Sequence, residues 1–233
     1  MLRLPLVLLL AFTGSLFADS FHQCGHCAKQ MLPSPTKLVP GRKYARDRRV
    51  DIQHVKLDVT PNFKDRTVAG IMTMDFKPIA LPLEKLELDA VDLRIDAVEV
   101  KGAELRDRQV TSEKLILSFA QPIPADAAVS VTVKFFAQPE RGLYFRTPEM
   151  GYKPGDTQVW TQGEADLHRF WFPCYDYPNE RFTSEVICHV PEGMETVSNG
   201  VLLGRKPKGD QVAWHWKQDK PHVNYLIALA AGY

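Results

Sequence analysis

Apolar and polar residues alternate in short runs along most of this chain, and this period of two restricts the fold more than any other feature. The clearest run places Val129, Val131, Val133 and Phe135 at alternate positions. Successive side chains of a strand point to opposite faces, so each run predicts a strand with one buried face. No window of ten or more residues carries a helical apolar stripe. The pattern therefore predicts an all-β chain.

The runs follow one another closely, as expected for a β-sandwich or a saddle-like pair of sheets. Thr60-Pro61-Asn62 is expected to turn the first two strands into a hairpin, Gly70 to mark a bulge or a close approach, and residues 121–124 to separate two later strands. Residues 141–183 break the pattern. The expected strands cover residues 50–59 and 93–100, each with a slip in register, and 67–76, 86–90, 115–117, 129–135, 183–190, 196–203, 212–217 and 224–233.

The first eighteen residues have the layout of a secretory signal peptide. Arg3 supplies the positive start, residues 4–12 form an apolar run, and Ala18 is a small residue at the expected cleavage point. An uncleaved membrane anchor is the alternative. Cleavage would give a secreted or periplasmic protein with no further membrane segment. Residues 19–47, which contain three prolines and no periodicity, are expected to be a linker, and residues 48–233 the β domain.

The four cysteines allow several interpretations. Cys24 and Cys27 form a C-x-x-C in the predicted linker, where a local disulfide or an incidental pair is favoured. A small metal clip with His22 and His26, or redox chemistry, are the alternatives. Cys174 is interpreted as a buried thiol in preference to half of a disulfide, and the state of Cys188 stays open.

The net charge argues against two kinds of partner, nucleic acid and an anionic membrane surface. The chain has 233 residues and a formal net charge of +1, which gives no electrostatic reason to bind nucleic acid or an anionic membrane surface. The basic run at 42–49 is diluted by Asp47 and is interpreted as a solvated linker, with a phosphate-binding patch as the alternative. The chain ends in an apolar strand, which suggests a missing partner domain.

Gln162 and Glu164 are the candidate binding residues. They are two positions apart, so on an extended backbone their side chains point to the same side. A carboxylate beside an amide can receive a substrate ammonium group. Nearby aromatic residues would strengthen that interaction by lowering the local dielectric constant. The alternative is that Glu164 forms a structural ion pair with Arg169, and the residues alone favour neither.

Several motifs in this region resemble the signature of the M1 (gluzincin) family of zinc aminopeptidases. The resemblance covers most of residues 48–233, and the motifs occur in the family's order and at matching spacing. They are Gln162-x-Glu164-Ala165 with Arg169, Phe172-Pro173-Cys174-x-Asp176-x-Pro178, Arg141-Gly142-Leu143-Tyr144, Val197-Ser198-Asn199-Gly200 and Tyr225-Leu226-Ile227-Ala228-Leu229.

The resemblance implies a saddle-like β-sandwich of antiparallel and mixed strands that covers a separate thermolysin-like catalytic domain. It implies that Glu164 binds the α-ammonium group of a peptide, that Gln162 lines the first substrate pocket, and that Ala165 follows a cis peptide bond. His168 stands where the family usually has a small residue and is interpreted as a neighbour of this loop.

The chemistry of the family is incomplete in this chain. None of the seven histidines belongs to an H-E-x-x-H motif, which would place two zinc ligands and a glutamate base on one helix, and the family's G-x-M-E-N motif is also missing. We therefore predict no catalytic residue and no metal ligand here. Zinc is expected in a catalytic domain outside this chain, and the chain alone is expected to be inactive.

The favoured hypothesis is the N-terminal, substrate-capping domain of an exported zinc aminopeptidase that removes N-terminal residues from peptides. A non-catalytic M1-like scaffold, or a β-sandwich that binds peptides or proteins, is the alternative. An exported thiol protein that uses Cys24 and Cys27 is the third hypothesis.

Overall fold

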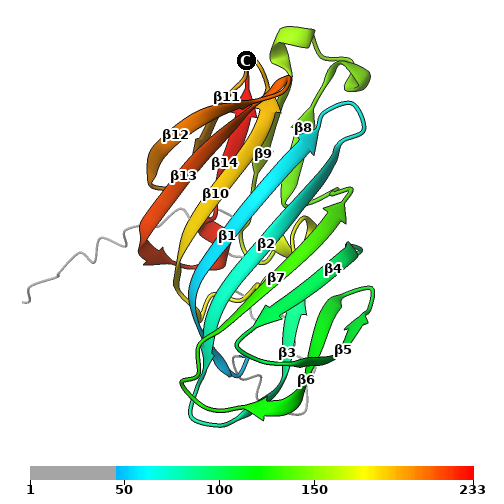
Figure 1. Ribbon diagram of the computed structural model, residues 1–233. Coiled ribbons are helices and arrows are strands. Elements are labelled where there is room, and N and C mark those ends of the chain that lie inside the picture. The colour runs from blue at the N-terminus through cyan, green and yellow to red at the C-terminus, as the bar shows by residue number, and fades with distance from the viewer. Residues whose placement is uncertain (1–45) are drawn as a thin grey trace, which may run out of the picture. The chain divides into compact units, whose positions relative to one another are not determined.

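The computed structural model describes residues 46–233, and within them almost all regular structure is β-strand. Fourteen strands, β1 to β14, form three sheets (Figure 1). The helices of this part of the chain are four three-residue 3-10 turns, at Pro148–Met150, Pro154–Asp156, His168–Phe170 and Asn224–Leu226. The expected all-β fold is confirmed.

The largest sheet has seven strands in the order β12-β13-β10-β1-β2-β7-β4. β1 pairs with β10 in parallel, and the other neighbours are antiparallel, so the sheet is mixed as expected. Its strands are β1 (Val50–Asn62), β2 (Thr67–Pro78), β4 (Arg94–Lys101), β7 (Val129–Ala137), β10 (Phe182–Pro191), β12 (Val201–Lys208) and β13 (Gln211–His222).

Two smaller sheets lie against one face of the large sheet, towards its opposite ends (Figure 1). The three-stranded sheet has the order β3-β6-β5, with β3 at Leu83–Asp89, β6 at Lys114–Ile123 and β5 at Leu105–Val110. The four-stranded sheet has the order β11-β14-β9-β8, with β11 at Glu195–Ser198, β14 at Leu229–Gly232, β9 at Gln158–Thr161 and β8 at Leu143–Arg146.

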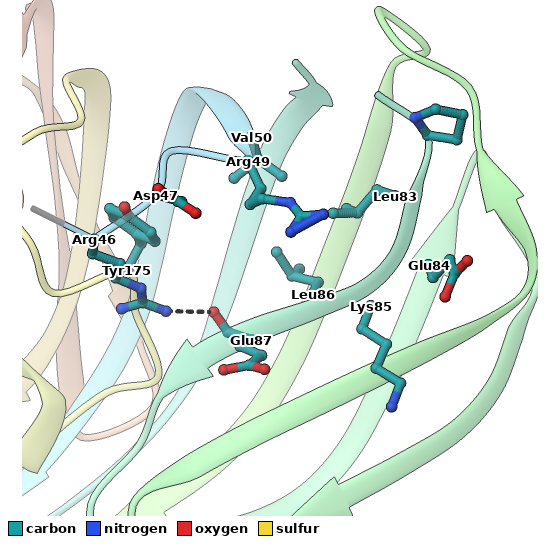
Figure 2. Close-up of a pocket in the computed structure, with 11 residues that line it drawn as sticks. Arg46, Asp47, Arg49, Val50, Leu83, Glu84, Lys85, Leu86, Glu87 and Tyr175 are labelled. Atoms are coloured by element: carbon teal, nitrogen blue, oxygen red, sulfur yellow. Dashed lines mark hydrogen bonds between the residues drawn. The ribbon is translucent and has the colours of Figure 1, made fainter. Parts of the chain in front are cut away.

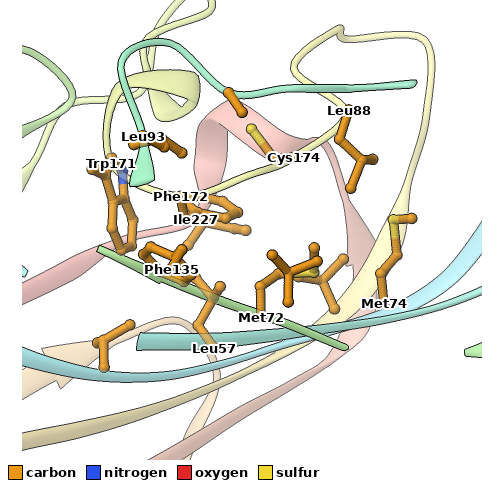
Figure 3. Packing of buried hydrophobic residues seen from close by; sticks show 14 of the residues in the cluster. Leu57, Met72, Met74, Leu88, Leu93, Phe135, Trp171, Phe172, Cys174 and Ile227 are labelled. Carbon is orange, nitrogen blue, oxygen red and sulfur yellow. The ribbon is translucent and has the colours of Figure 1, made fainter. Parts of the chain in front are cut away.

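The hydrophobic core fills the space between the large sheet and the smaller ones (Figure 3). Leu57, Met72 and Phe135 enter it from the large sheet, and the alternating burial of β1 and β7 matches the period of two in the sequence. Trp171 and Phe172 also lie in this core with no exposed surface. They belong to the segment that follows the candidate loop, so the core holds that segment in place.

Several details of the hairpin predictions are confirmed. β1 and β4 each contain the expected slip in register, between Ile52 and His54 and between Ile95 and Ala97, one or two residues before the positions where the alternation changes. Gly70 is a close approach and not a bulge, because an added Cβ atom would lie 2.9 Å from the side chains of Phe135 and Val59.

Other boundaries were wrong. β1 continues through Asn62 and the turn occupies residues 63–66, since backbone pairing with β2 extends to the Asn62–Thr67 pair. β6 runs through residues 121–123, which were expected to separate two strands. The last ten residues form a 3-10 turn and a short strand whose residues are alternately buried and exposed, in place of one buried strand.

Four strands were not predicted. The single strand expected over residues 196–203 is two strands, β11 and β12, which belong to different sheets. The other three are β5, β8 and β9. β8 and β9 have four residues each, too few to show a periodic pattern. β5 is an edge strand whose side chains are almost all exposed, so backbone pairing with β6 forms it without an apolar face. β5 pairs with β6, the next strand along the chain, whereas β9 pairs with β14, about seventy residues later.

The predicted signal peptide, Cys24, Cys27 and nearly all of the predicted linker lie outside the described residues. Within residues 46–233, no helix combines the length and the apolar character needed to cross a membrane.

Candidate functional site

The Gln162–Glu164 loop leaves the end of β9 and is held by two backbone hydrogen bonds. The amide of Gln162 donates to the carbonyl of Gly142 at 3.0 Å, and the amide of Leu167 donates to the carbonyl of Gly163 at 2.9 Å. Gln162 and Glu164 are both exposed, whereas Gly163 between them is buried. Both polar side chains therefore face solvent, in a loop that lies just beyond the last residue of β9. The peptide bond between Glu164 and Ala165 is cis, as expected.

Gly163 packs directly against two other segments. A Cβ atom added to it would lie 2.3 Å from Nε2 of His168 and 2.4 Å from the carbonyl oxygen of Tyr225. Real Cβ atoms do not approach other atoms this closely, so glycine is required by space at this position. The buried side of the loop is thus in contact with the segment before β14.

Arg169 pairs with aspartates and not with Glu164. Its Nε lies 3.2 Å from Oδ2 of Asp176, and its Nη2 lies 3.1 Å from Oδ2 of Asp166. Its backbone amide also donates to Asp176 at 3.1 Å. Among residues 46–233 no ion pair includes Glu164, so the alternative of a structural Glu164–Arg169 pair is not what this fold forms.

Asp176 is the centre of a buried polar network beneath the loop. Its side chain is 1% exposed and accepts a hydrogen bond of 2.7 Å from Nδ2 of Asn224. Burial raises the pKa of the Asp176 carboxyl, and the hydrogen bonds from Asn224 and Arg169 oppose that rise. Its amide donates to Asp89, which in turn pairs with Arg46 at 2.6 Å. The Asp of the F-P-C-x-D-x-P motif therefore has a structural role.

The aromatic residues near the loop do not surround Glu164. Trp171 and Phe172 are fully buried in the core, and the Glu164 side chain is exposed. The expected lowering of the dielectric constant around Glu164 is therefore not provided by the described residues. The dielectric constant around Glu164 would fall if a second domain covered the loop.

Residues 46–233 contain no group of three or more His, Cys, Asp or Glu residues arranged to hold a metal ion. Their histidines have protein partners instead: Trp171 for His168, Asp58 for His189, Glu185 for His54 and His215, and Ser184 for His222. These side chains do not fit a zinc site, and we assign no chemistry to a metal in this part of the chain.

Cys174 and Cys188 are free and buried, which confirms the interpretation of Cys174 as a buried thiol. Burial raises the pKa of the Cys188 thiol to about 12 and that of Cys174 well above its usual value. Neither thiol is ionised at neutral pH, so neither is suited to nucleophilic chemistry.

A pocket of about 500 Å³ lies between the start of β1 and β3 (Figure 2). Arg46 closes one side by donating to the carbonyl of Glu87 at 3.2 Å and stacking on Tyr175. Acidic and basic side chains line it in equal number, three of each, so its wall favours no sign of charge. None of the candidate residues Gln162, Glu164 and Ala165 lines it.

An apolar row crosses the outer face of the four-stranded sheet and leads to the loop. Val197, Ala230, Trp160 and Tyr144 are paired in register across β11, β14, β9 and β8. Val197 is 64% exposed and Trp160 is 38% exposed, and the Trp160 ring stacks on Tyr144 at 5.9 Å. Gln162 follows Trp160 by two positions and is also exposed, so it continues the same face.

Solved structures identify the class of fold. An M1 zinc metallopeptidase from Deinococcus radiodurans superimposes with a TM-score of 0.68 at 22% identity, over 79% of this chain and 42% of that one. A two-domain M1 zinc metallopeptidase bound to L-arginine gives a TM-score of 0.68 at 21% identity, over 80% of this chain and 43% of that one. The fold is thus that of a β domain of zinc metallopeptidases.

The sequence defines the family. The model of the peptidase M1 N-terminal domain matches residues 51–226, and the chain belongs to that family. The match includes the Gln162–Glu164 loop, Asp176 and Asn224.

Curated relatives agree with this assignment. Leucine aminopeptidase 2 of Candida glabrata is 28% identical over 189 residues, and aminopeptidase B of Homo sapiens is 26% identical over 215 residues. These matches cover 78% and 79% of this chain but 28% and 32% of the relatives. The chain therefore spans about a third of the length of the curated relatives that it matches.

Proposed function

We propose that this chain is the substrate-capping domain of an exported zinc aminopeptidase, and that Glu164 and Gln162 bind the free amino terminus of a peptide. The observation that carries the proposal is the exposure of Glu164 beside Gln162 while Arg169 is paired elsewhere. An exposed carboxylate without a protein cation is free to accept a charge-assisted hydrogen bond from an ammonium group. Ala165 completes the loop, and the predicted signal peptide supports export.

The apolar row supplies the geometry for a second domain. We propose that the zinc-bearing domain of the same protein covers Val197, Ala230, Trp160 and Tyr144. Gln162 continues this face, so a domain seated on the row would reach the loop and place Glu164 at the edge of its active site. Covering the loop would also remove water from Glu164 and strengthen its contact with an ammonium group.

The first experiment concerns the whole gene product that contains this chain. We expect it to release N-terminal residues from aminoacyl-naphthylamides and to lose that activity when zinc is chelated. The 233-residue chain by itself is expected to show no such activity. A gene that ends at Tyr233, or a purified whole product without aminopeptidase activity, would support the non-catalytic scaffold instead.

The second experiment tests the loop in that enzyme. Glu164→Gln is expected to lower kcat/KM for substrates with a free amino terminus by about 10- to 100-fold, since the carboxylate charge that would pair with the ammonium group is lost. Gln162→Ala is expected to have a smaller effect in the same direction. Glu104→Gln, which changes an exposed carboxylate directly before β5, is the matched control. Unchanged kinetics for Glu164→Gln would remove this residue from the substrate site.

A further inference from the structure

His168 is a fully buried histidine directly beneath the candidate loop. It opens the 3-10 turn at His168–Phe170 and has no exposed surface. Its ring packs against the rings of Trp171 and Phe172 at centroid distances of 5.7 and 5.5 Å. The core therefore fixes the ring in one position, a few residues after Glu164.

The contacts of His168 define its tautomer. Nε1 of Trp171 donates to Nδ1 of His168 at 2.8 Å. An indole nitrogen can only donate, so Nδ1 must be an acceptor without a proton. Burial lowers the pKa of His168 to about 4, so the ring is neutral at pH 7. Its single ring proton is then on Nε2.

Nε2 lies near the backbone of the segment before β14, because it and the Tyr225 carbonyl oxygen both lie next to Gly163. Backbone groups of Ile227 and Tyr225 lie close enough to the ring to raise the pKa of His168, against the larger effect of burial, although Nε2 makes no regular hydrogen bond. Gly163 packs against both His168 and Tyr225, because its added Cβ atom would lie 2.3 Å from Nε2 and 2.4 Å from the Tyr225 carbonyl oxygen. His168 thus contacts both the loop and the 225–227 segment.

We propose that His168 is a positioning residue that joins the Gln162–Glu164 loop to the 225–227 segment through Nε2. Trp171 orients the ring, Nε2–H faces the carbonyls, and the buried Gly163 rests on the ring edge. The consequence for substrate rests on the function proposed above: a loop held in this way presents Glu164 in one place before substrate arrives. The structural link itself does not depend on that function.

The direct experiment uses the 233-residue chain labelled with ¹⁵N. The ring nitrogen shifts of His168 at pH 7 are expected to show a neutral ring protonated at Nε2. A ring protonated at Nδ1, or a charged ring, would overturn the proposal even if no variant folds.

Hydrogen exchange tests the link to the loop. His168→Leu removes Nε2 and its proton. The amides of Gln162 and Leu167 are then expected to exchange about tenfold faster, because the loop that their hydrogen bonds hold opens more often. His168→Gln places an amide donor near the position of Nε2 and is expected to restore much of the protection. His189→Leu, at another buried histidine, is the control for a general loss of stability. Equal exchange in His168→Leu and His189→Leu would overturn the proposal.

Kinetics of the whole enzyme separate the two proposals. His168→Leu is expected to raise KM for substrates with a free amino terminus more than it lowers kcat, and His168→Gln to recover part of that loss. Faster exchange in the loop without a kinetic change would contradict the substrate role of Glu164 and leave the structural role of His168 intact. Unchanged exchange would contradict the role of His168 alone.

Discussion

Asp176 accepts a hydrogen bond of 2.7 Å from Asn224, and this contact joins segments that are 48 residues apart. Asp176 also pairs with Arg169, the residue after His168, and Asn224 directly precedes Tyr225. The two segments that enclose the buried side of the loop are therefore anchored to one carboxylate. Because this carboxylate is buried, substitutions of it should affect the stability of the chain more directly than the binding of a peptide.

Asp176→Ala is expected to lower the free energy of unfolding by about 3–5 kcal/mol, because Arg169 and Asn224 lose a buried partner. Urea unfolding of the 233-residue chain would measure the change. Asp166→Ala removes the exposed partner of the same arginine and should cost roughly 1 kcal/mol or less. Similar losses for the two variants would contradict the central role of Asp176.

Gly163→Ala is expected to destabilise the chain by about 1–3 kcal/mol, because the new methyl group would overlap His168 and the Tyr225 carbonyl. Thermal or urea unfolding measures the effect. Gly155→Ala is the matched control, since nothing lies within 4 Å of its added Cβ atom, and it should change stability by less than about 1 kcal/mol. A neutral Gly163→Ala variant would show that the loop is not packed in this way.

Stability is expected to fall as the pH drops from about 6.5 to about 4, with His168 as one cause. The pKa of His168 is about 4 in the folded chain and near 6.5 when unfolded. The unfolded state therefore binds its proton first, and the folded state loses about 3 kcal/mol across that window. Above pH 6.5 the His168 ring is neutral in both states, so it no longer makes stability depend on pH. Burial also lowers the pKa of His222, which acts in the same direction.

His168→Gln isolates that contribution. Its free energy of unfolding should depend less steeply on pH between 6.5 and 4 than that of the unaltered chain, whatever its stability at pH 7. Urea unfolding at several pH values gives both slopes. Parallel slopes would mean that the pKa of His168 is not lowered in the folded chain.

Trp160 and Val197 are expected to be protected in the whole gene product. If a zinc-bearing domain covers the apolar row, hydroxyl-radical footprinting should label both side chains severalfold more slowly there than in the 233-residue chain. Val110, which is 43% exposed on β5, should be labelled equally in both. Equal labelling of Trp160 in the two proteins would contradict the proposed docking face.

Cys174 and Cys188 are expected to resist alkylation at pH 8 in the folded chain and to react in urea. Both thiols are buried, and burial raises the pKa of each, so the reactive thiolate is scarce and inaccessible. Mass spectrometry of the labelled peptides distinguishes these sites from Cys24 and Cys27. Rapid labelling of Cys188 without denaturant would show that β10 opens readily.

The sequence by itself determined the all-β character of this chain, because alternation along β1 and β7 reports which side chains of a strand face the core. It also singled out Gln162 and Glu164 as a candidate polar pair, and both are exposed in the loop that follows β9. The family motifs located the loop, and the matched family confirmed them.

Only the tertiary structure decided which partners the polar residues take. Arg169 lies near Glu164, Asp166 and Asp176 in the sequence, and the packing of the 168–176 segment on the core directs it to the two aspartates. The contact of His168 with the 225–227 segment spans more than fifty residues, so no local pattern could reveal it. The spacing of two residues in a strand determines whether their side chains point to the same face. The partner of a side chain depends on which distant segments the core brings together.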